Sequence, residues 1–79
     1  MTFDYNKLRG KIKEIFGTQD KFASALGIGR VSLSQRLNNN LDFSGTEIFS
    51  ACNLLNISAE EIPKYFFTPE VQKHEQISV

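Results

Sequence analysis

With 79 residues the chain has room for one small domain, and its 41% hydrophobic and 23% charged residues are typical of a globular protein. No apolar run approaches the roughly 18 residues that a membrane span needs, and the first residues lack the apolar stretch of a secretory signal, so a cytoplasmic protein is expected. Cys52 and His74 are the only cysteine and histidine. One chain therefore cannot assemble a zinc cluster of four such ligands, and we expect neither a metal nor a cofactor.

The net charge is zero, yet the charges are segregated along the chain. Seven basic and two acidic residues lie between Lys7 and Arg36, which gives this segment a balance of +5. From Leu37 onward two basic residues face six acidic ones, a balance of −4. Because small proteins often segregate charge by chance, the basic segment favours nucleic-acid binding only where a binding motif accompanies it.

The first half of the chain begins with two predicted helices. Apolar residues recur at helical spacing from Tyr5 to Phe16, and Gly17 follows at once as a stop signal. Thr18 then offers a hydroxyl to cap a second helix over residues 19–26. Gly27 ends this second helix after only two turns.

A third helical pattern covers residues 30–38, where Leu33 and Leu37 share one face. Gly29 stands at its start, so the side-chain cap that serine or threonine would give is missing. Three consecutive asparagines at 38–40 terminate the pattern, because asparagine tolerates the left-handed conformation that a helix end needs.

The second half carries two capping boxes, in which a serine and a glutamate three residues later satisfy each other's backbone amides. Ser44 and Glu47 open a helix to about Leu55, with Cys52 in the core and not a nucleophile. The second box, from Ser58 to Glu61, opens a short helix that Pro63 should end or kink. Residues 68–70 either start another turn or begin a frayed tail to residue 79, in which His74 has no assigned role.

Two short helices joined by a tight glycine turn form the helix-turn-helix pattern. The residues that fit the crossing of the two helices are Ala23, Gly27, Ile28 and Leu33. The stretch from residue 19 to 38, with its FA, LGI and LSQRLN segments, resembles the lambda-repressor-like, Cro-type helix-turn-helix family. With the later segment EIPKYFF, residues 7–67 are similar to small temperate-phage regulators of the Cro or modulator-of-repression type.

This resemblance implies one all-α domain of five helices over residues 1–67, a tail over residues 68–79, and a third helix that enters the DNA major groove. The base-reading positions that it implies are Arg30, Val31, Ser34, Gln35 and Asn38, and arginine and glutamine suit guanine and adenine. The candidates for contacts with the DNA backbone are Gln19, Lys21, Ser32, Arg36 and Lys11. In the family the position of Arg36 is usually apolar.

Three consecutive aromatic residues, Tyr65, Phe66 and Phe67, have two interpretations. They either cover the bottom of the core or form a protein interface with the acidic residues Glu60 and Glu61. Both interpretations stay open, because few residues remain in so short a chain to bury three aromatic side chains.

Two functions follow from the sequence. The first prediction is a phage transcriptional regulator that binds operator DNA as a homodimer, because one recognition helix covers too few base pairs for useful specificity. The alternative is an antirepressor or modulator of repression, which presents acidic and apolar groups to the basic surface of the lysogeny repressor. Arg30 and Gln35 favour DNA, whereas the zero net charge and Val31 favour the protein partner. No catalytic constellation is present, so an enzyme is not expected.

Overall fold

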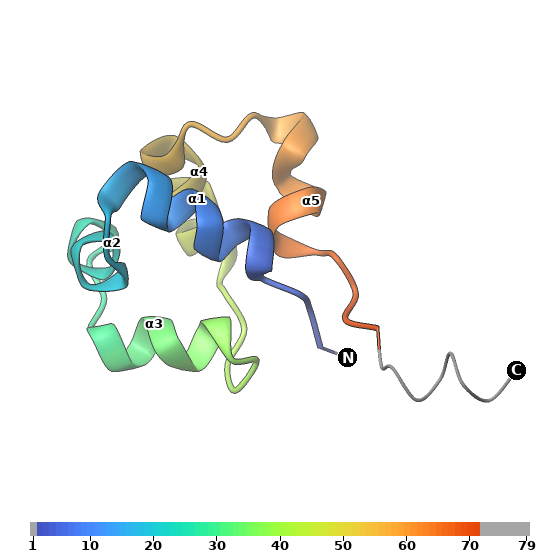
Figure 1. The fold of residues 1–79 in the computed structure, drawn as a ribbon, viewed down its shortest axis with the longest axis horizontal. Helices are drawn as coiled ribbons and strands as arrows, with labels where there is room; N and C mark the ends of the chain where they lie inside the picture. Colours follow the sequence, from blue (N-terminus) through green and yellow to red (C-terminus); the bar gives the residue numbers. More distant parts are fainter. Residues whose placement is uncertain (1, 72–79) are drawn as a thin grey trace, which may run out of the picture.

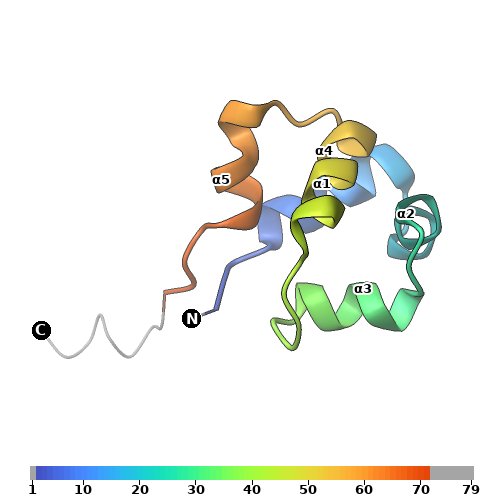
Figure 2. The same cartoon turned by 180° about the vertical axis from the view of Figure 1, so that it is seen from behind.

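The computed structural model describes residues 2–71 of the chain. These residues form five α-helices and one 3₁₀-helix, which confirms the predicted all-α, five-helix fold. The elements are α1 (Asn6–Phe16), α2 (Gln19–Leu26), α3 (Arg30–Leu37), α4 (Gly45–Leu55), η1 (Ala59–Glu61) and α5 (Ile62–Phe66). Figures 1 and 2 show α1 and α4 at the centre, α2 and α5 at opposite ends, and α3 along one edge. None of these helices is long and apolar enough to cross a membrane.

The predicted turn between α2 and α3 is confirmed. The Thr18 hydroxyl caps α2 by accepting a hydrogen bond of 3.2 Å from the amide of Lys21, whose side chain is exposed. Gly27 has the left-handed conformation, with φ of 84°, and its amide donates to the Ala23 carbonyl at 3.0 Å. Ala23 is only 1% exposed where the two helices cross. Gly27 therefore directs the chain from α2 into α3.

The two ends of α3 also agree with the sequence. Gly29 gives no side-chain hydrogen bond at the start of the helix. Asn39 takes the left-handed conformation after its end, with φ of 64°. The Arg9 guanidinium reaches across from α1 and donates to the Leu37 carbonyl at 3.0 Å. α3 is therefore fixed more firmly at its C-terminal end than at its N-terminal end.

The capping boxes mark the starts of α4 and η1, and the short helix that the second box opens ends at Glu61, just before Pro63, as predicted. The Ser44 hydroxyl accepts from the Glu47 amide at 3.1 Å, and the Ser44 amide donates to the Glu47 carboxylate at 3.0 Å. At the second box the Ser58 amide and hydroxyl both donate to the Glu61 carboxylate. Pro63 lies in the first turn of α5 and begins this helix. Proline is tolerated there because the amide that it lacks would have no partner inside the helix.

The core lies between the helices and includes two of the three consecutive aromatic residues. Tyr65 is 8% exposed and Phe66 is 1% exposed, so these two side chains belong to the core and leave little surface for a partner protein. Phe67, in contrast, is 47% exposed. Cys52 is buried as predicted, and burial raises the pKa of its thiol. Ile15 is 46% exposed, because α1 turns Phe16 inward against Phe22 at its last residue.

The two ends of the described segment pair with each other. The Asp4 amide donates to the Thr68 carbonyl at 2.8 Å, and the Glu70 amide donates to the Thr2 carbonyl at 3.1 Å. Residues 68–70 of the predicted tail therefore pair with the first segment of the chain. On its other side the first segment is held by Asn39, whose amide group bonds both the backbone N–H and the carbonyl of Phe3 at 2.9 Å. His74 lies outside the described residues.

Candidate interaction surface

The outer face of α3 gathers the residues predicted to read bases. Val31 lies there with 66% of its surface exposed. A groove of about 300 Å³ runs beside it and is lined by Gln19 and the five predicted positions, Arg30, Val31, Ser34, Gln35 and Asn38. The helix-turn-helix geometry thus brings Gln19 and the predicted base readers onto one surface.

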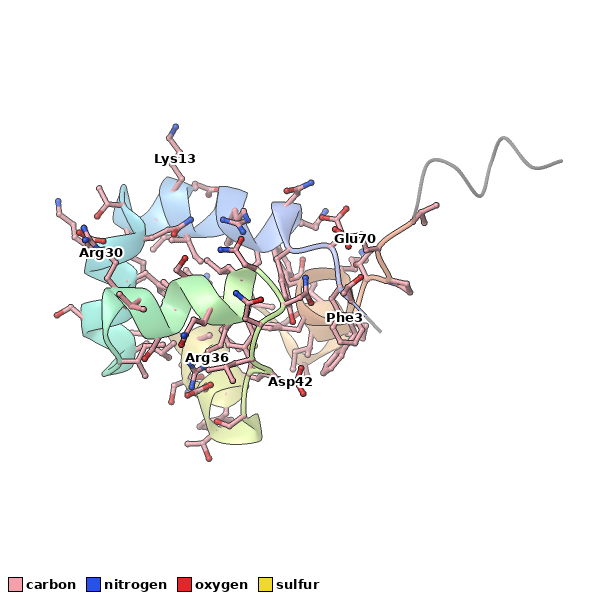
Figure 3. All side chains as sticks on the ribbon, turned by 90° about the horizontal axis from the view of Figure 1, so that it is seen from below. Phe3, Lys13, Arg30, Arg36, Asp42 and Glu70 are labelled. Carbon is pink, nitrogen blue, oxygen red and sulfur yellow. The ribbon has the colours of Figure 1, made fainter. Side chains whose placement is uncertain are left out.

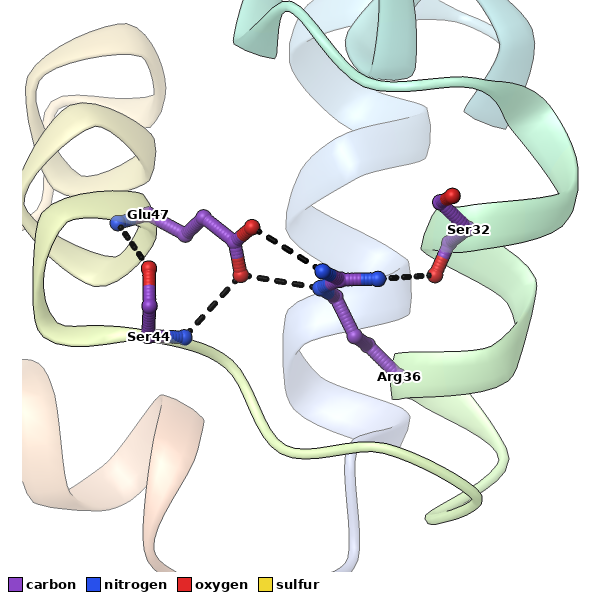
Figure 4. Close-up of polar contacts among 4 residues, drawn as sticks. All are labelled: Ser32, Arg36, Ser44 and Glu47. Carbon is purple, nitrogen blue, oxygen red and sulfur yellow. Dashed lines mark hydrogen bonds and ion pairs between the residues drawn. The ribbon is translucent and has the colours of Figure 1, made fainter.

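Arg36 does not contribute to this surface. Its guanidinium forms a two-point ion pair with the Glu47 carboxylate of α4, at 2.8 Å from Nε and 3.1 Å from Nη2 (Figure 4). Nη1 donates to the Ser32 carbonyl at 2.8 Å. The two side chains are only 17% and 18% exposed, and the hydrogen bonds from Arg36 are the largest cause of a lowered pKa of Glu47. This pair joins α3 to α4 at a position that is usually apolar in the helix-turn-helix family, and the phosphate contact of Arg36, which stays a prediction, would compete with it.

The second arginine of α3 also faces a carboxylate of the same chain. Arg30 Nη1 lies 3.5 Å from Asp20 Oδ2 in α2, and both side chains are mostly exposed. The Asn38 side chain accepts a hydrogen bond from Arg9 and donates one to Ser34. Both cations of α3 are therefore paired, and the predicted reading face is close to neutral.

Lys11 does not line the α3 groove, and its ammonium group lies 3.9 Å from the carboxylate of Glu14 on the same helix. Hydrogen bonds from Ser58 are the main cause of a lowered pKa of Glu61, and the charge of Lys11 adds a smaller effect. Lys13 is two residues further along α1 and therefore points in nearly the opposite direction. It lines a small hollow together with Gln19 at the start of α2. The DNA-backbone contact of Lys11 stays a prediction, whereas Lys13 is the lysine of α1 that shares a hollow with Gln19.

The predicted acidic and aromatic interface is divided between separate parts of the molecule. Glu60 and Glu61 belong to η1, which Figure 1 shows at the end of α5 away from α3. Phe67 follows the other end of α5. These three residues therefore do not form one patch.

Another hollow, which no sequence pattern predicts, lies beside Phe67. It has a volume of about 230 Å³ and is lined by Phe3, Tyr5, Asp42, Phe43, Ile48, Phe66 and Phe67. Its rings contact one another edge to face, with centroids 5.6 Å apart for Phe3 and Phe67 and 5.5 Å apart for Tyr5 and Phe43. Burial raises the pKa of the Tyr5 hydroxyl, and the negative charge of Asp42 raises it further. We call this hollow the aromatic pocket.

A third hollow connects the α3 groove with the aromatic pocket. It has a volume of about 570 Å³ and is formed mainly by the paired ends of the described segment. It shares Asn38 with the α3 groove and Phe3 and Tyr5 with the aromatic pocket. This hollow therefore adjoins both of the others, and we call the three together the hollowed face. Figure 3 shows Lys13 and Arg30 toward one end of the molecule and Asp42 and Glu70 toward the other.

Comparisons with known proteins assign the chain to a family. The model of the family DUF739, described as proteins of unknown function, matches residues 1–69. The chain belongs to this family. Among solved structures it is similar to the modulator of repression of the temperate bacteriophage TP901-1 from Lactococcus lactis, determined in solution. The two are 40% identical with a TM-score of 0.76, and the match covers 91% of this chain and 97% of the other. No curated protein matches the chain.

The residues of the aromatic pocket carried a weak signal in the sequence. The chain has seven phenylalanines and no tryptophan. Three of these phenylalanines, Phe3, Phe43 and Phe67, stand outside the helices, where apolar periodicity gives no indication of what they contact. Only the pairing of the two ends of the described segment brings Phe3 against Phe67, and such long-range pairing has no local pattern.

Proposed function

We propose that the protein is a modulator of repression of a temperate phage or prophage, and that it acts in the bacterial cytoplasm by binding the lysogeny repressor. The observation that carries this proposal is the pairing of both α3 arginines with carboxylates of the same chain. The 40% identity to a phage modulator of repression supports it as well. In the sequence analysis this function stood second to operator binding.

The pairing matters because DNA binding depends on cations that neutralise phosphates. Arg36 would have to leave a partly buried carboxylate, and Glu47 would then remain without a partner. The centre of the α3 face is Val31, an exposed apolar side chain among uncharged polar ones. An apolar centre with a polar rim suits a protein partner.

The charge at the other end of the hollowed face supports a DNA-binding protein as that partner. Asp42 and Glu70 lie there, and neither is in an ion pair among residues 2–71. A repressor must carry a basic surface where it contacts DNA. An acidic surface that covers this basic one would speed association and would compete with the operator.

Operator binding in the manner of the Cro-type helix-turn-helix family is the second candidate. The left-handed Gly27 and the groove that joins Gln19 with Arg30 and Gln35 favour it. In this case we expect a homodimer on two half-sites, with Lys13 and Lys21 on the phosphates.

A gel-shift experiment with the repressor of the same phage and its operator separates the two functions. If the protein modulates repression, it gives no specific shift alone and changes the shift that the repressor gives. A specific shift by the protein alone, with no effect on the repressor, would support operator binding instead.

The Val31→Asp variant tests the surface in the same experiment. Val31 is exposed, so an aspartate there leaves the core intact but adds charge to the apolar centre, and the effect on the repressor should fall. Phe49→Asp is the matched control, because Phe49 is 69% exposed on α4 and lines none of the three hollows. Loss of the effect with Phe49→Asp alone would place the interface on α4.

A further inference from the structure

The aromatic pocket has a lining of unusual composition. Of its seven lining residues, five are aromatic, one is aliphatic, and only Asp42 carries a charge. Asp42 is exposed, and its carboxylate takes part in none of the three ion pairs of the described segment. The pocket therefore combines π faces with one negative charge that no cation of the described residues balances.

We infer that the aromatic pocket binds a single arginine side chain of the partner protein, with its apolar stem between the rings and its guanidinium at Asp42. This inference rests on the proposed function, because it takes the partner to be a protein with a basic surface. It adds the site and the chemistry by which that partner is held.

The size of the pocket supports a single side chain. A volume of about 230 Å³ equals that of a cube about 6 Å wide, which is narrower than the roughly 10 Å diameter of a helix. Phe67 and Phe3 form one wall with an edge-to-face contact, and Tyr5 and Phe43 form another. A pocket of this size accommodates one long side chain but not a whole helix.

The charge of the pocket selects a cation. Aromatic faces are negative and attract cations, and a carboxylate beside them adds to this attraction. The negative charge of Asp42 extends into the pocket, since it adds to the raised pKa of Tyr5. An acidic side chain of the partner would be repelled, and an apolar one would leave the Asp42 carboxylate without an opposite charge.

Arginine fits better than lysine because its guanidinium is planar. It stacks on aromatic rings and can donate two parallel hydrogen bonds to one carboxylate, whereas lysine presents a compact, strongly hydrated charge. Arginine is also frequent on surfaces that bind phosphate, so a repressor that covers the α3 groove has such side chains within reach. The hollow that shares Asn38 with the α3 groove and Phe3 with the aromatic pocket adjoins both sites.

Calorimetry with the DNA-binding domain of the repressor tests the inference on the full chain. Asp42→Asn should raise Kd about tenfold and weaken the salt dependence of binding. Glu60→Gln removes the same charge from an exposed residue of η1, outside the pocket, and should leave Kd within about twofold of the wild type. Phe67→Ala, which shortens one half-exposed wall, should weaken binding as Asp42→Asn does. Wild-type affinity in both pocket variants would overturn the inference and leave the proposed function standing.

A titration with small probes tests the pocket without the repressor. The ring signals of Phe3 and Phe67 are followed by NMR while N-acetyl-arginine amide is added, and N-acetyl-citrulline amide, which has nearly the same shape without the charge, is the control. Larger shifts with the arginine probe, which are lost in Asp42→Asn, support the inference. Equal shifts with both probes, or none with either, would overturn it. If the wild-type chain does not bind the repressor domain, the proposed function fails, and this titration still decides whether the pocket selects a cation.

Discussion

Gly27 determines the angle between α2 and α3 at the scale of a single residue. Its φ of 84° lies in the left-handed region, and a Cβ atom placed there would meet no heavy atom within 4 Å. Any cost of a side chain at this position is therefore conformational and not steric. The helix-turn-helix geometry depends on this one backbone conformation.

Gly27→Ala should lower the free energy of unfolding by about 1 kcal/mol, because the left-handed backbone conformation costs energy for alanine but not for glycine. Gly10→Ala is the control. Gly10 lies inside α1 with equally open space around it, and alanine there should raise stability by about 0.5–1 kcal/mol. Urea unfolding of the two variants measures both changes, and stabilisation by Gly27→Ala would mean that the turn lies elsewhere.

The pair of Arg36 and Glu47 gives a second prediction at this scale. Glu47→Gln keeps an oxygen that accepts from the Ser44 amide but removes the charge that Arg36 binds, so stability at pH 7 should fall by about 2 kcal/mol. The exposed Glu14, 3.9 Å from Lys11, is the control, and Glu14→Gln should change stability by less than about 0.5 kcal/mol.

The same pair predicts a pH dependence. Hydrogen bonds from Arg36 lower the pKa of Glu47 in the folded state below its ordinary value of 4.5. The stabilisation is therefore fully present above pH 4.5 and is lost as the pH falls through the lower, folded-state pKa. Urea unfolding at several pH values should show the gap between wild type and Glu47→Gln closing on acidification. A gap that stays constant to pH 3 would contradict this role of the ion pair.

At the scale of an element, the segment Thr2–Asp4 lies between two partners. Residues 68–70 bond one side of its backbone, and the Asn39 side chain bonds the other side at Phe3. Asn39 acts here as a short substitute for a neighbouring strand. The segment thereby connects the end of α3 to the wall of the aromatic pocket.

Asn39→Gly should release this segment while keeping the left-handed backbone at position 39. Amide hydrogen exchange should become faster at Phe3, Asp4 and Glu70 and should stay unchanged in the centre of α1. Asn56→Gly is the matched control, because Asn56 is also left-handed, with φ of 57°, and its side chain makes no hydrogen bond within the described segment. Unchanged exchange at Phe3 in Asn39→Gly would show that residues 68–70 hold the segment without Asn39.

Sequence patterns predicted elements whose causes are local. Thr18, Gly27 and the Ser44 box each act within four residues, and the structure has them where they were expected. Local patterns did not predict that a further helix, α5, begins around Pro63, because proline fits a first helical turn as well as a helix end. The pair of Arg36 with Glu47 and the aromatic pocket join distant segments, and no local spacing encodes such contacts.

At the scale of the whole molecule, the charges that are segregated along the sequence are also separated in space. Lys13 and Arg30 lie toward one end, and Asp42 and Glu70 lie toward the other (Figure 3). The paired arginines and Val31 make the face of α3 nearly neutral between them. A face with an acidic end and an apolar centre is complementary to a basic, DNA-binding protein surface, and salt should slow its association with that surface.

Isothermal titration of the full chain with the DNA-binding domain of the repressor of the same phage tests the central claim most directly. The account predicts a complex in the absence of DNA, with Kd of about 10 μM or lower and an affinity that falls with added salt. Val31→Asp should weaken this complex without changing the melting temperature. No heat at tens of micromolar, together with specific operator binding by the chain alone, would contradict the account.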